Sequence, residues 1–242
     1  MSVAVFGGGG YVGSHILRAL RAKYPSVPLL SISRSGKPAF PTAMVAGVEY
    51  ISGDLTDSKG AWGPLLKEKG VTGCVSCVGA FGSNEFMIKV NGEANATCAQ
   101  VASEQGVARF VYVSTVDNDL PDFVLKGYFQ GKRQAEAAVL RLFPAPGAGT
   151  ILRPSFVYGT RSVSATASIP LGLVGKPMEA VLTCFPFNQL QRLPGMRAVL
   201  APPVAVEHVA AVAAAAAVGS LDTKAPQILD VEYIRSTGLK LV

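Results

Sequence analysis

One stretch near the start of the chain predicts most of its architecture: Val3-Ala4-Val5-Phe6-Gly7-Gly8-Gly9-Gly10-Tyr11-Val12-Gly13-Ser14-His15. A short apolar run meets four consecutive glycines and then a helical pattern, which predicts a strand that turns tightly into a helix. The first N–H groups of such a helix have no partner within it and attract a phosphate. The stretch therefore predicts an anion-binding turn.

Three glycines of this turn have separate predicted tasks. Gly7 permits the tight turn, Gly10 lets the backbone approach a diphosphate, and Gly13 lets the helix pack closely on the strand. Their spacing is Gly-x2-Gly-x2-Gly, whereas many dehydrogenases have Gly-x-Gly-x2-Gly, and Gly8 and Gly9 blur the difference. A glycine-rich turn alone is often only a turn. Because the chain continues as a dinucleotide fold should, we expect a dinucleotide here.

Length and composition indicate one α/β domain. The 242 residues can bury a sizeable core but do not suffice for two full domains. Charged residues interrupt every long apolar run before it reaches the ~20 residues that span a bilayer, so no transmembrane helix is predicted. The net charge is +6, but the basic residues are scattered and form no run with interleaved aromatic residues. We therefore expect no nucleic acid partner.

The cysteines do not predict a metal site. Cys74 and Cys77 have CxxC spacing, but they lie in the apolar run 71–78, which predicts a buried strand whose positions three apart face opposite ways. No second such pair and no histidine pair completes a zinc site. We expect reduced thiols and no bound metal.

The end of the second predicted strand, 27–34, bears on the choice of cofactor. An acidic residue there would hold the ribose 2′-hydroxyl of NAD, whereas this strand ends in Ser33-Arg34 and is followed by Lys37. A cationic end suits the 2′-phosphate of NADP. NADP(H) is therefore favoured over NAD(H), although the same cations also fit an ordinary solvated loop.

The third predicted strand, 48–51, leads to Asp54 and Leu55. Asp54 lies where a carboxylate at the carboxyl edge of the sheet accepts a bond from an adenine amino group, with Leu55 against the ring. The same residue is also suited to capping the helix that follows. These two interpretations are compatible, and the sequence leaves both open.

The fourth predicted strand, 73–78, runs through Val78 into Gly79. Small residues at this position leave room for a cofactor where the strand order reverses. A helix predicted at 85–105 follows and contains Asn91-Gly92. Because glycine inside a helix costs about 1 kcal/mol, this pair indicates close packing or a specific hydrogen bond.

The candidate catalytic residues are Ser114, Tyr128 and Lys132. Tyr128 and Lys132 are four residues apart and share one face of a predicted helix. An ammonium close to a phenol stabilises the phenolate and lowers its pKa from ~10 toward the working pH. The fifth predicted strand, 108–115, ends in hydroxyl side chains, and we expect Ser114 to bond a substrate carbonyl beside the phenol.

The chain divides into three predicted parts. A sixth strand at 149–153 leads into Pro154 and completes a nucleotide-binding core, 1–155. Residues 156–203 are apolar and irregular, and 169–203 fit a lid over a small apolar substrate, a surface for a protein partner, or a surface that rests on lipid. Residues 204–242 predict an alanine-rich helix, a short strand and a final helix that complete the fold.

These motifs, together with Leu152-Arg153-Pro154-Ser155-Phe156-Val157-Tyr158-Gly159, resemble the extended and atypical short-chain dehydrogenase/reductase superfamily over almost the whole chain. More narrowly, residues 33–36, 91–95, 127–133 and 201–204 look like a plant and algal organellar branch. That branch is similar to the nucleotide-binding accessory subunit of mitochondrial complex I and to a fungal protein of ubiquinone synthesis.

The resemblance implies a Rossmann-type doubly wound parallel sheet with a small C-terminal substrate or lid portion. It also implies that Asn91 orders the active-site helix and that Lys132 holds the nicotinamide ribose and tunes Tyr128. The cofactor-binding residues that it and the motifs indicate are Gly7, Gly10, Tyr11, Val12, Gly13, Ser33, Arg34, Asp54, Leu55, Val78, Gly79, Asn91, Lys132 and Pro154.

The resemblance further suggests a chloroplast or a mitochondrion. Met1 directly precedes the first predicted strand, so the sequence itself shows no transit peptide, as in a cytoplasmic protein or a form that lacks its leader.

Two functions of different classes fit the sequence. One is an NADP(H)-dependent oxidoreductase for a carbonyl or quinone-like apolar substrate; the other is a non-catalytic NADP(H)-binding structural or assembly subunit of a respiratory, quinone-synthesis or photosynthetic complex. The packing of the apolar segment distinguishes them, because a segment folded over the nicotinamide favours an enzyme and an exposed patch favours a partner. A weaker third interpretation is a redox sensor.

Overall fold

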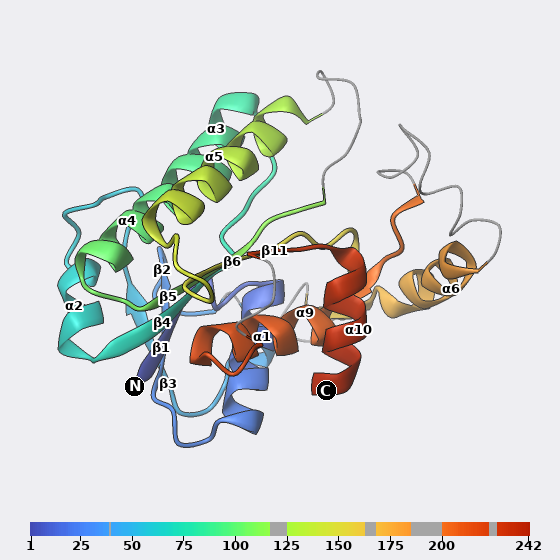
Figure 1. Cartoon of the computed structure of the whole chain (residues 1–242), viewed down its shortest axis with the longest axis horizontal. Helices are drawn as coiled ribbons and strands as arrows, with labels where there is room; N and C mark the ends of the chain where they lie inside the picture. Colours follow the sequence, from blue (N-terminus) through green and yellow to red (C-terminus); the bar gives the residue numbers. More distant parts are fainter. Residues whose placement is uncertain (39, 117–124, 163–167, 185–199, 223–226) are drawn as a thin grey trace.

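The short apolar runs of the sequence form one parallel sheet in the computed structural model (Figure 1). The structure describes residues 1–38, 40–116, 125–162, 168–184, 200–222 and 227–242. Within these ranges, no helix combines the length and the apolar character that crossing a bilayer needs.

Seven strands lie side by side in the order β11-β6-β5-β4-β1-β2-β3. Their bounds are β1 (Ser2–Phe6), β2 (Leu29–Ser33), β3 (Val48–Ser52), β4 (Val71–Ser76), β5 (Arg109–Val113), β6 (Gly149–Leu152) and β11 (Ile228–Leu229). Outside this sheet, β7 (Val157–Tyr158) pairs in parallel with β10 (Val204–Ala205), and β8 (Thr160–Ser162) pairs antiparallel with β9 (Ser168–Pro170). The strand order reverses between β1 and β4, so the carboxyl ends of these strands border a crevice.

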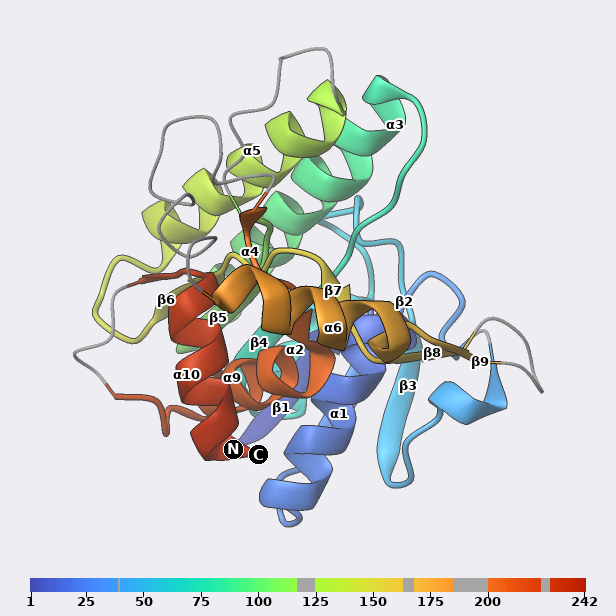
Figure 2. The same ribbon diagram turned by 90° about the vertical axis from the view of Figure 1, so that its right-hand side faces the viewer.

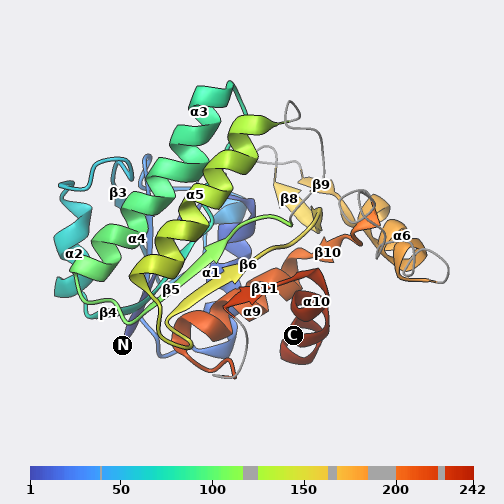
Figure 3. The same ribbon diagram turned by 45° about the horizontal axis from the view of Figure 1, so that its top comes forward.

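Figure 2 looks onto the carboxyl edge of the sheet, with α6 (Gly172–Thr183) across the front. The other helices cover the two faces (Figure 3). One face carries α1 (Tyr11–Lys23), α9 (Val206–Val218) and α10 (Val231–Leu241). The other carries α2 (Trp62–Glu68), α5 (Lys126–Leu142) and a continuous helical run of α3 (Asn84–Ile88), the π-helical turn η2 (Lys89–Glu93) and α4 (Ala94–Glu104); a short 3-10 turn, η1 (Pro41–Ala43), follows β2.

The two layers of helices divide the core in two. Val3 and Val5 of β1 belong to the cluster under α1 and α9, whereas Ala4 and Phe6 belong to the cluster under α4 and α5. In the second cluster, the Phe6 ring meets Trp62 edge-on with ring centroids 5.5 Å apart. Burial on both faces explains why the strands are continuous apolar runs instead of alternating ones.

The alanine-rich helix that the sequence predicts is α9, and it is buried nearly all round between α1, α10 and the sheet. Its small side chains let the helix approach β4 closely. A Cβ atom at Gly73 of β4 would lie 2.1 Å from the carbonyl oxygen of Ala217. This contact between a helix and a strand therefore requires glycine at position 73.

The structure confirms the predicted fold class, because its strand order is that of a Rossmann-type doubly wound sheet. The predicted elements are found in order, with ends that differ by a residue or two. The helix predicted at 85–105 differs in kind, since η2 interrupts it. In the segment 156–203, residues 185–199 lie outside the described ranges, and the division into three parts stays a prediction.

We expect Gly73→Ala to destabilise the fold, because the added methyl group would meet the α9 backbone. Overpacking of this kind costs about 2 kcal/mol, which corresponds to a fall in Tm of roughly 4–8 °C for a chain of this size. Gly172→Ala is the matched control, since a Cβ there has no neighbour closer than 3.8 Å. Thermal unfolding of both variants checks this, and equal Tm values would contradict the close contact.

Candidate functional site

A cavity of about 410 Å³ opens at the carboxyl edge of the sheet, where the strand order reverses. Eight of the predicted cofactor-binding residues line it: Gly7, Gly10, Ser33, Arg34, Asp54, Leu55, Val78 and Gly79. Its other lining residues, which the sequence analysis did not select, are Thr56, Cys77, Ala80, Phe86, Lys89, Val90 and Ala94. The structure thus gathers the motifs that follow β1, β2, β3 and β4 around one opening.

The glycine turn has the geometry that its sequence predicts. Gly7 has φ +79°, a region that favours glycine, and its carbonyl oxygen accepts a hydrogen bond from Gly10 N at 3.0 Å. A Cβ at Gly13 would lie 2.3 Å from that oxygen, so only glycine lets α1 pack here. No side chain caps the start of α1 at Gly10, and Gly10 itself lines the cavity, so the positive end of the helix dipole lies there.

Tyr11, Val12 and Gly13 form the first turn of α1 and do not line the cavity with the other predicted residues. Gly13 lies beneath the turn, where its role is close packing. Tyr11 points toward the other side of the helix end, since a Cβ at Gly159 would come within 2.9 Å of its hydroxyl.

Asp54 lines the cavity together with two cations, Arg34 and Lys89. Its Oδ1 accepts hydrogen bonds from Thr56 N at 2.9 Å and Thr56 Oγ1 at 2.8 Å. These bonds, with smaller contributions from Lys89 and Arg34, lower the pKa of Asp54. The alternative that Asp54 caps the next helix is wrong, because its side chain closes a turn with Thr56 and α2 begins only at Trp62.

Asn91 and Asn95 hold the loop that follows β4. Asn91 Nδ2 donates to the carbonyl oxygen of Ala80 at 2.8 Å and to that of Met87 at 2.9 Å. Asn95 Nδ2 donates to the carbonyl oxygen of Val78 at 3.2 Å. Both side chains are fully buried. The Asn91-Gly92 pair thus has the specific hydrogen bonds that the sequence indicates, and Asn91 acts on the cavity through Ala80 without lining it.

Lys132 lies buried beneath this loop and clamps the end of β5. Its Nζ donates to the carbonyl oxygen of Val113 at 2.9 Å and lies 4.9 Å from the centroid of the Tyr112 ring. Burial lowers the pKa of Lys132 from 10.5 to about 8. The neighbouring Arg133 Nη2 donates to the carbonyl oxygen of Thr115 at 2.7 Å. Consecutive residues of α5 therefore fix the strand end.

Tyr128 is half-buried and is not among the residues that line the cavity. Its ring is stacked on that of Phe81 at a centroid distance of 4.9 Å. Lys132 Nζ lies 5.7 Å from the centroid of the Tyr128 ring. Burial raises the pKa of Tyr128, opposed in part by a hydrogen bond with the Thr115 side chain and by the charge of Arg133. The predicted lowering of this pKa by Lys132 is therefore not found, because burial has the largest effect and the opposing groups are Thr115 and Arg133.

The structure separates Ser114 from the phenol with which the sequence analysis paired it. The Ser114 side chain is buried beside Glu136, where it helps to lower the pKa of that carboxyl against the effect of burial. Thr115 is the hydroxyl beside the Tyr128 phenol. Both hydroxyls lie beyond the end of β5 at Val113, so the predicted strand did not fix which of them meets the phenol.

Glu136 is the centre of a buried ionic cluster behind this site. Its Oε1 lies 2.5 Å from Arg133 Nη1, and its Oε2 lies 2.6 Å from Arg153 Nη2. Arg153 precedes Pro154, whose carbonyl oxygen accepts from Val116 N at 2.9 Å. Pro154 does not line the cavity. Its hydrogen bond instead holds the segment after β6 beside the segment after β5.

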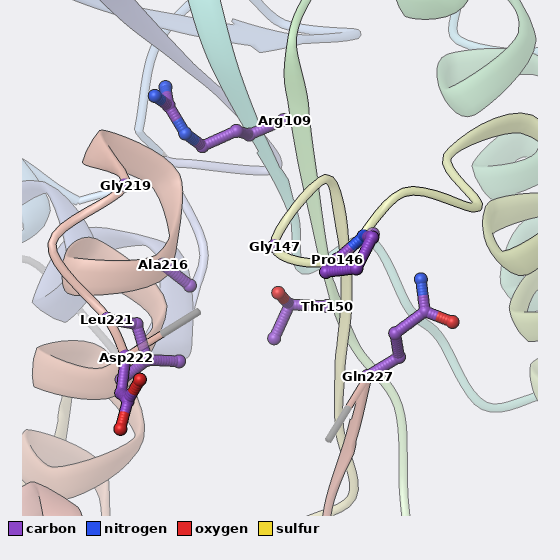
Figure 4. Close-up of a pocket in the computed structure, with 10 residues that line it drawn as sticks. Arg109, Pro146, Gly147, Thr150, Ala216, Gly219, Leu221, Asp222 and Gln227 are labelled. Atoms are coloured by element: carbon purple, nitrogen blue, oxygen red, sulfur yellow. The ribbon is translucent and has the colours of Figure 1, made fainter. Parts of the chain in front are cut away.

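A smaller cavity of about 220 Å³ lies at the opposite, amino edge of the sheet (Figure 4). Thr150 points into it, whereas the Arg109 guanidinium lies over Gly219 at the end of α9. Parallel sheets of this type bind ligands at their carboxyl edge, so the cavity of about 410 Å³ is the candidate site. Within the described ranges, no group of three or more His, Cys, Asp or Glu side chains is arranged to hold a metal ion.

The profile of the NAD dependent epimerase/dehydratase family matches residues 3–173. The chain belongs to this family. The protein At1g32220 of Arabidopsis thaliana, described as an uncharacterized chloroplastic protein, is 39% identical over 211 residues, which are 86% of this chain and 68% of that protein. The resemblance to the short-chain dehydrogenase/reductase superfamily is thereby confirmed at the level of an NAD(P)-binding family of extended type.

Solved structures of this type share the fold. The UDP-glucose 4-epimerase of Thermotoga maritima, solved with UDP-glucose, matches with a TM-score of 0.64 and 15% identity, covering 95% of this chain and 76% of that one. The enzyme WbmG of Bordetella bronchiseptica, solved with NAD and UDP, matches with a TM-score of 0.64 and 20% identity, covering 96% and 72%. At these identities the likeness extends to the fold alone.

We expect the burial of Lys132 to give stability a distinct pH dependence. Between about pH 8 and pH 10.5 the unfolded chain holds a proton that the folded protein has released, so the free energy of unfolding rises with pH in this window. Lys132→Met removes this term. Urea unfolding of both proteins at about pH 7.5 and about pH 9.5 checks it, with the wild type gaining on the variant at the higher pH. If the difference in free energy of unfolding between the wild type and the variant were the same at both pH values, it would contradict a lowered pKa of Lys132.

Proposed function

We propose that this protein is an NADP(H)-dependent oxidoreductase that acts on a carbonyl or quinone-like apolar substrate. One observation carries the proposal: a phenol, Tyr128, lies with the Thr115 hydroxyl at the carboxyl edge of the sheet that holds the nucleotide cavity. Lys132 lies behind the phenol ring with its ammonium buried. A proton donor, a hydroxyl that bonds a carbonyl and a cation are the groups that such a reaction needs.

In the proposed mechanism, the bound nicotinamide cofactor supplies the hydride. Tyr128 donates the proton to the substrate oxygen, and the Thr115 hydroxyl orients that oxygen toward the phenol. Lys132, whose pKa is lowered to about 8, remains largely protonated near neutral pH and stabilises the phenolate that forms. Because Lys132 also holds the carbonyl of Val113, it keeps the end of β5 aligned with α5.

The preference for NADP(H) over NAD(H) is part of the proposal. Arg34 and Lys89 both line the cavity, and both act on the charge of Asp54. Arg34 follows the end of β2 and Lys89 begins η2, so these two cations from different elements together offer a binding site for a phosphate dianion. Lys37, which the sequence also suggested, is not among the lining residues.

The second candidate function is a non-catalytic NADP(H)-binding subunit of an organellar complex. It is favoured by α6, whose outer apolar residues are exposed instead of folded over the cavity. We propose a plastid as the compartment, because the Arabidopsis relative is chloroplastic. The suggested likeness to the complex I subunit and to the ubiquinone-synthesis protein would place such a subunit in a mitochondrion, and both compartments remain part of this alternative.

The proposed mechanism predicts a division of labour among three side chains. Tyr128→Phe should bind NADPH normally but lose about a hundredfold or more in kcat, and Thr115→Val should lose kcat with it. Ser114→Ala is the matched control and should retain turnover, because Ser114 faces Glu136. NADPH oxidation with short-chain quinones, simple ketones and UDP-sugars as substrates measures this.

Loss of turnover in Ser114→Ala with full turnover in Thr115→Val would reverse the assignment of the hydroxyl. If the wild type binds NADPH tightly and no substrate of the panel is turned over, the non-catalytic alternative is favoured.

Cofactor preference provides a separate prediction. Arg34→Gln and Lys89→Gln should each weaken NADPH binding by roughly tenfold, because each removes a charge-assisted hydrogen bond to the 2′-phosphate. NADH binding should change little in both variants. Lys37→Gln is the control cation and should bind NADPH as the wild type does. Titration calorimetry measures all four proteins, and equal losses for the two cofactors would refute a 2′-phosphate site.

A further inference from the structure

An ordinary surface helix packs its apolar face against the protein and exposes its polar face, whereas α6 does the reverse. Its inner face carries Glu179, which accepts hydrogen bonds from Arg235 Nε at 2.6 Å and from the Tyr158 hydroxyl. Gly175 lies on the Tyr158 ring, where no Cβ would fit. The helix is therefore attached through a polar cluster, and its apolar residues are left for the outer face.

The outer face forms one apolar stripe. Val174, Met178 and Val181 follow the i, i+4, i+7 spacing of a helix face, and Leu173 adjoins them. Leu173 is 76% exposed, Val174 66% and Val181 53%. Ordinary surface helices turn such residues inward, so an exposed stripe of this kind marks an interaction surface.

Further exposed apolar side chains lie at the same edge of the sheet. Phe81 follows β4, Leu125 precedes α5, and Phe156 follows β6; their exposed fractions are 69%, 42% and 48%. In Figure 2, which faces this edge, α6 crosses the front below the ends of α3 and α5. We call α6's stripe and these three residues the apolar rim.

The charge near the rim is positive. Among the described residues, two exposed cations adjoin the rim, Lys176 of α6 and Lys126 next to Leu125, and the one acidic residue of α6 is Glu179. That carboxylate is neutralised by Arg235 on the inner side of α6, whereas Lys176 of the same helix is exposed. The whole chain carries a net charge of +6. A surface that binds the apolar rim must therefore have an apolar interior and a negatively charged boundary.

We infer that the apolar rim docks the protein onto a membrane surface that carries anionic lipids, with the cavity mouth toward the lipid. A bilayer meets both requirements, because acyl chains receive the apolar side chains and anionic headgroups attract the cations. The rim residues belong to separate elements of the fold, which suits a fluid surface better than the continuous pocket of a protein partner. The contact is peripheral, since none of the described helices can span a bilayer. The proposed membrane contact does not depend on whether the protein is catalytically active.

Vesicle co-sedimentation of the full chain, without cofactor or substrate, tests this inference. The protein should bind vesicles of about two parts phosphatidylcholine to one part phosphatidylglycerol, bind pure phosphatidylcholine at least about fivefold more weakly, and dissociate as salt is raised. Equal binding to both vesicle types, or no binding to either, would overturn the inference.

Variants locate the contact. The triple variant Leu173→Gln, Val174→Gln, Val181→Gln should reduce vesicle affinity by about tenfold or more, and Lys176→Glu should reduce it by roughly fivefold. The matched controls are Met44→Gln with Leu239→Gln, which are exposed apolar residues elsewhere, and Lys59→Glu. Unchanged binding of the triple variant would contradict the role of α6.

Light scattering after gel filtration tests whether a second copy of the chain binds the stripe of α6 instead of a membrane. A monomeric wild type that binds vesicles supports the inference. A wild-type dimer that the triple variant converts to a monomer, with no vesicle binding, would instead assign the stripe to a second copy of the chain. NADPH binding, measured in the same samples, should be equal in all variants, so that failure of lipid binding is distinguished from failure of the nucleotide site.

Discussion

The close approach of α1 to the end of β1 is the contact on which the site depends. Gly13 lies so near the carbonyl oxygen of Gly7 that any side chain would separate helix and strand. The approach leaves the uncapped start of α1 at the crevice between β1 and β4, where the strand order reverses. The positive end of the helix dipole then lies at the cavity, which is an arrangement that favours binding of a diphosphate.

The candidate catalytic groups depend on a second set of backbone contacts. Lys132 and Arg133 of α5 hold the carbonyl oxygens of Val113 and Thr115, so the helix that carries the phenol is fastened to the strand that carries the hydroxyl. Glu136, one turn further along α5, pairs with Arg133 and with Arg153 beyond β6. Three neighbouring segments are thereby held in one geometry by charged groups that burial makes costly to separate.

The sequence predicted the fold and much of the cavity because these features are local. A strand, a glycine turn and a helix follow one another within a few residues, and the residues at strand ends meet at one edge in any doubly wound sheet. Lys89 and Phe86 were missed because they lie within a helix and carry no motif; only the packing of η2 beside the crevice brings them to the cavity. An exposed cation on the helix after β4 was the sole signal for Lys89.

The choice between the hydroxyls of Ser114 and Thr115 shows what the spacing of residues in the sequence cannot predict. Ser114 and Thr115 are neighbouring hydroxyls beyond the end of β5 at Val113, so the sequence gave no means to tell which of them meets Tyr128. In the structure Tyr112 donates to Asn91 O on the helix side, and Ser114 follows it there. Likewise, four-residue spacing placed Lys132 near Tyr128 but did not reveal that burial would dominate the pKa values of both.

The π-helical turn at Lys89–Glu93 has a consequence for how this protein tolerates insertions and deletions. A π turn holds one residue more than an α turn over the same length, and the amides of Asn91 and Asn95 occupy carbonyl groups around it, including those of Met87 and Val90. Removing one residue here would restore a regular helix without shifting α4. It would also rotate the residues before the deletion by about 100° about the helix axis, carrying Lys89 and Phe86 off the crevice while the rest of the fold stayed in place.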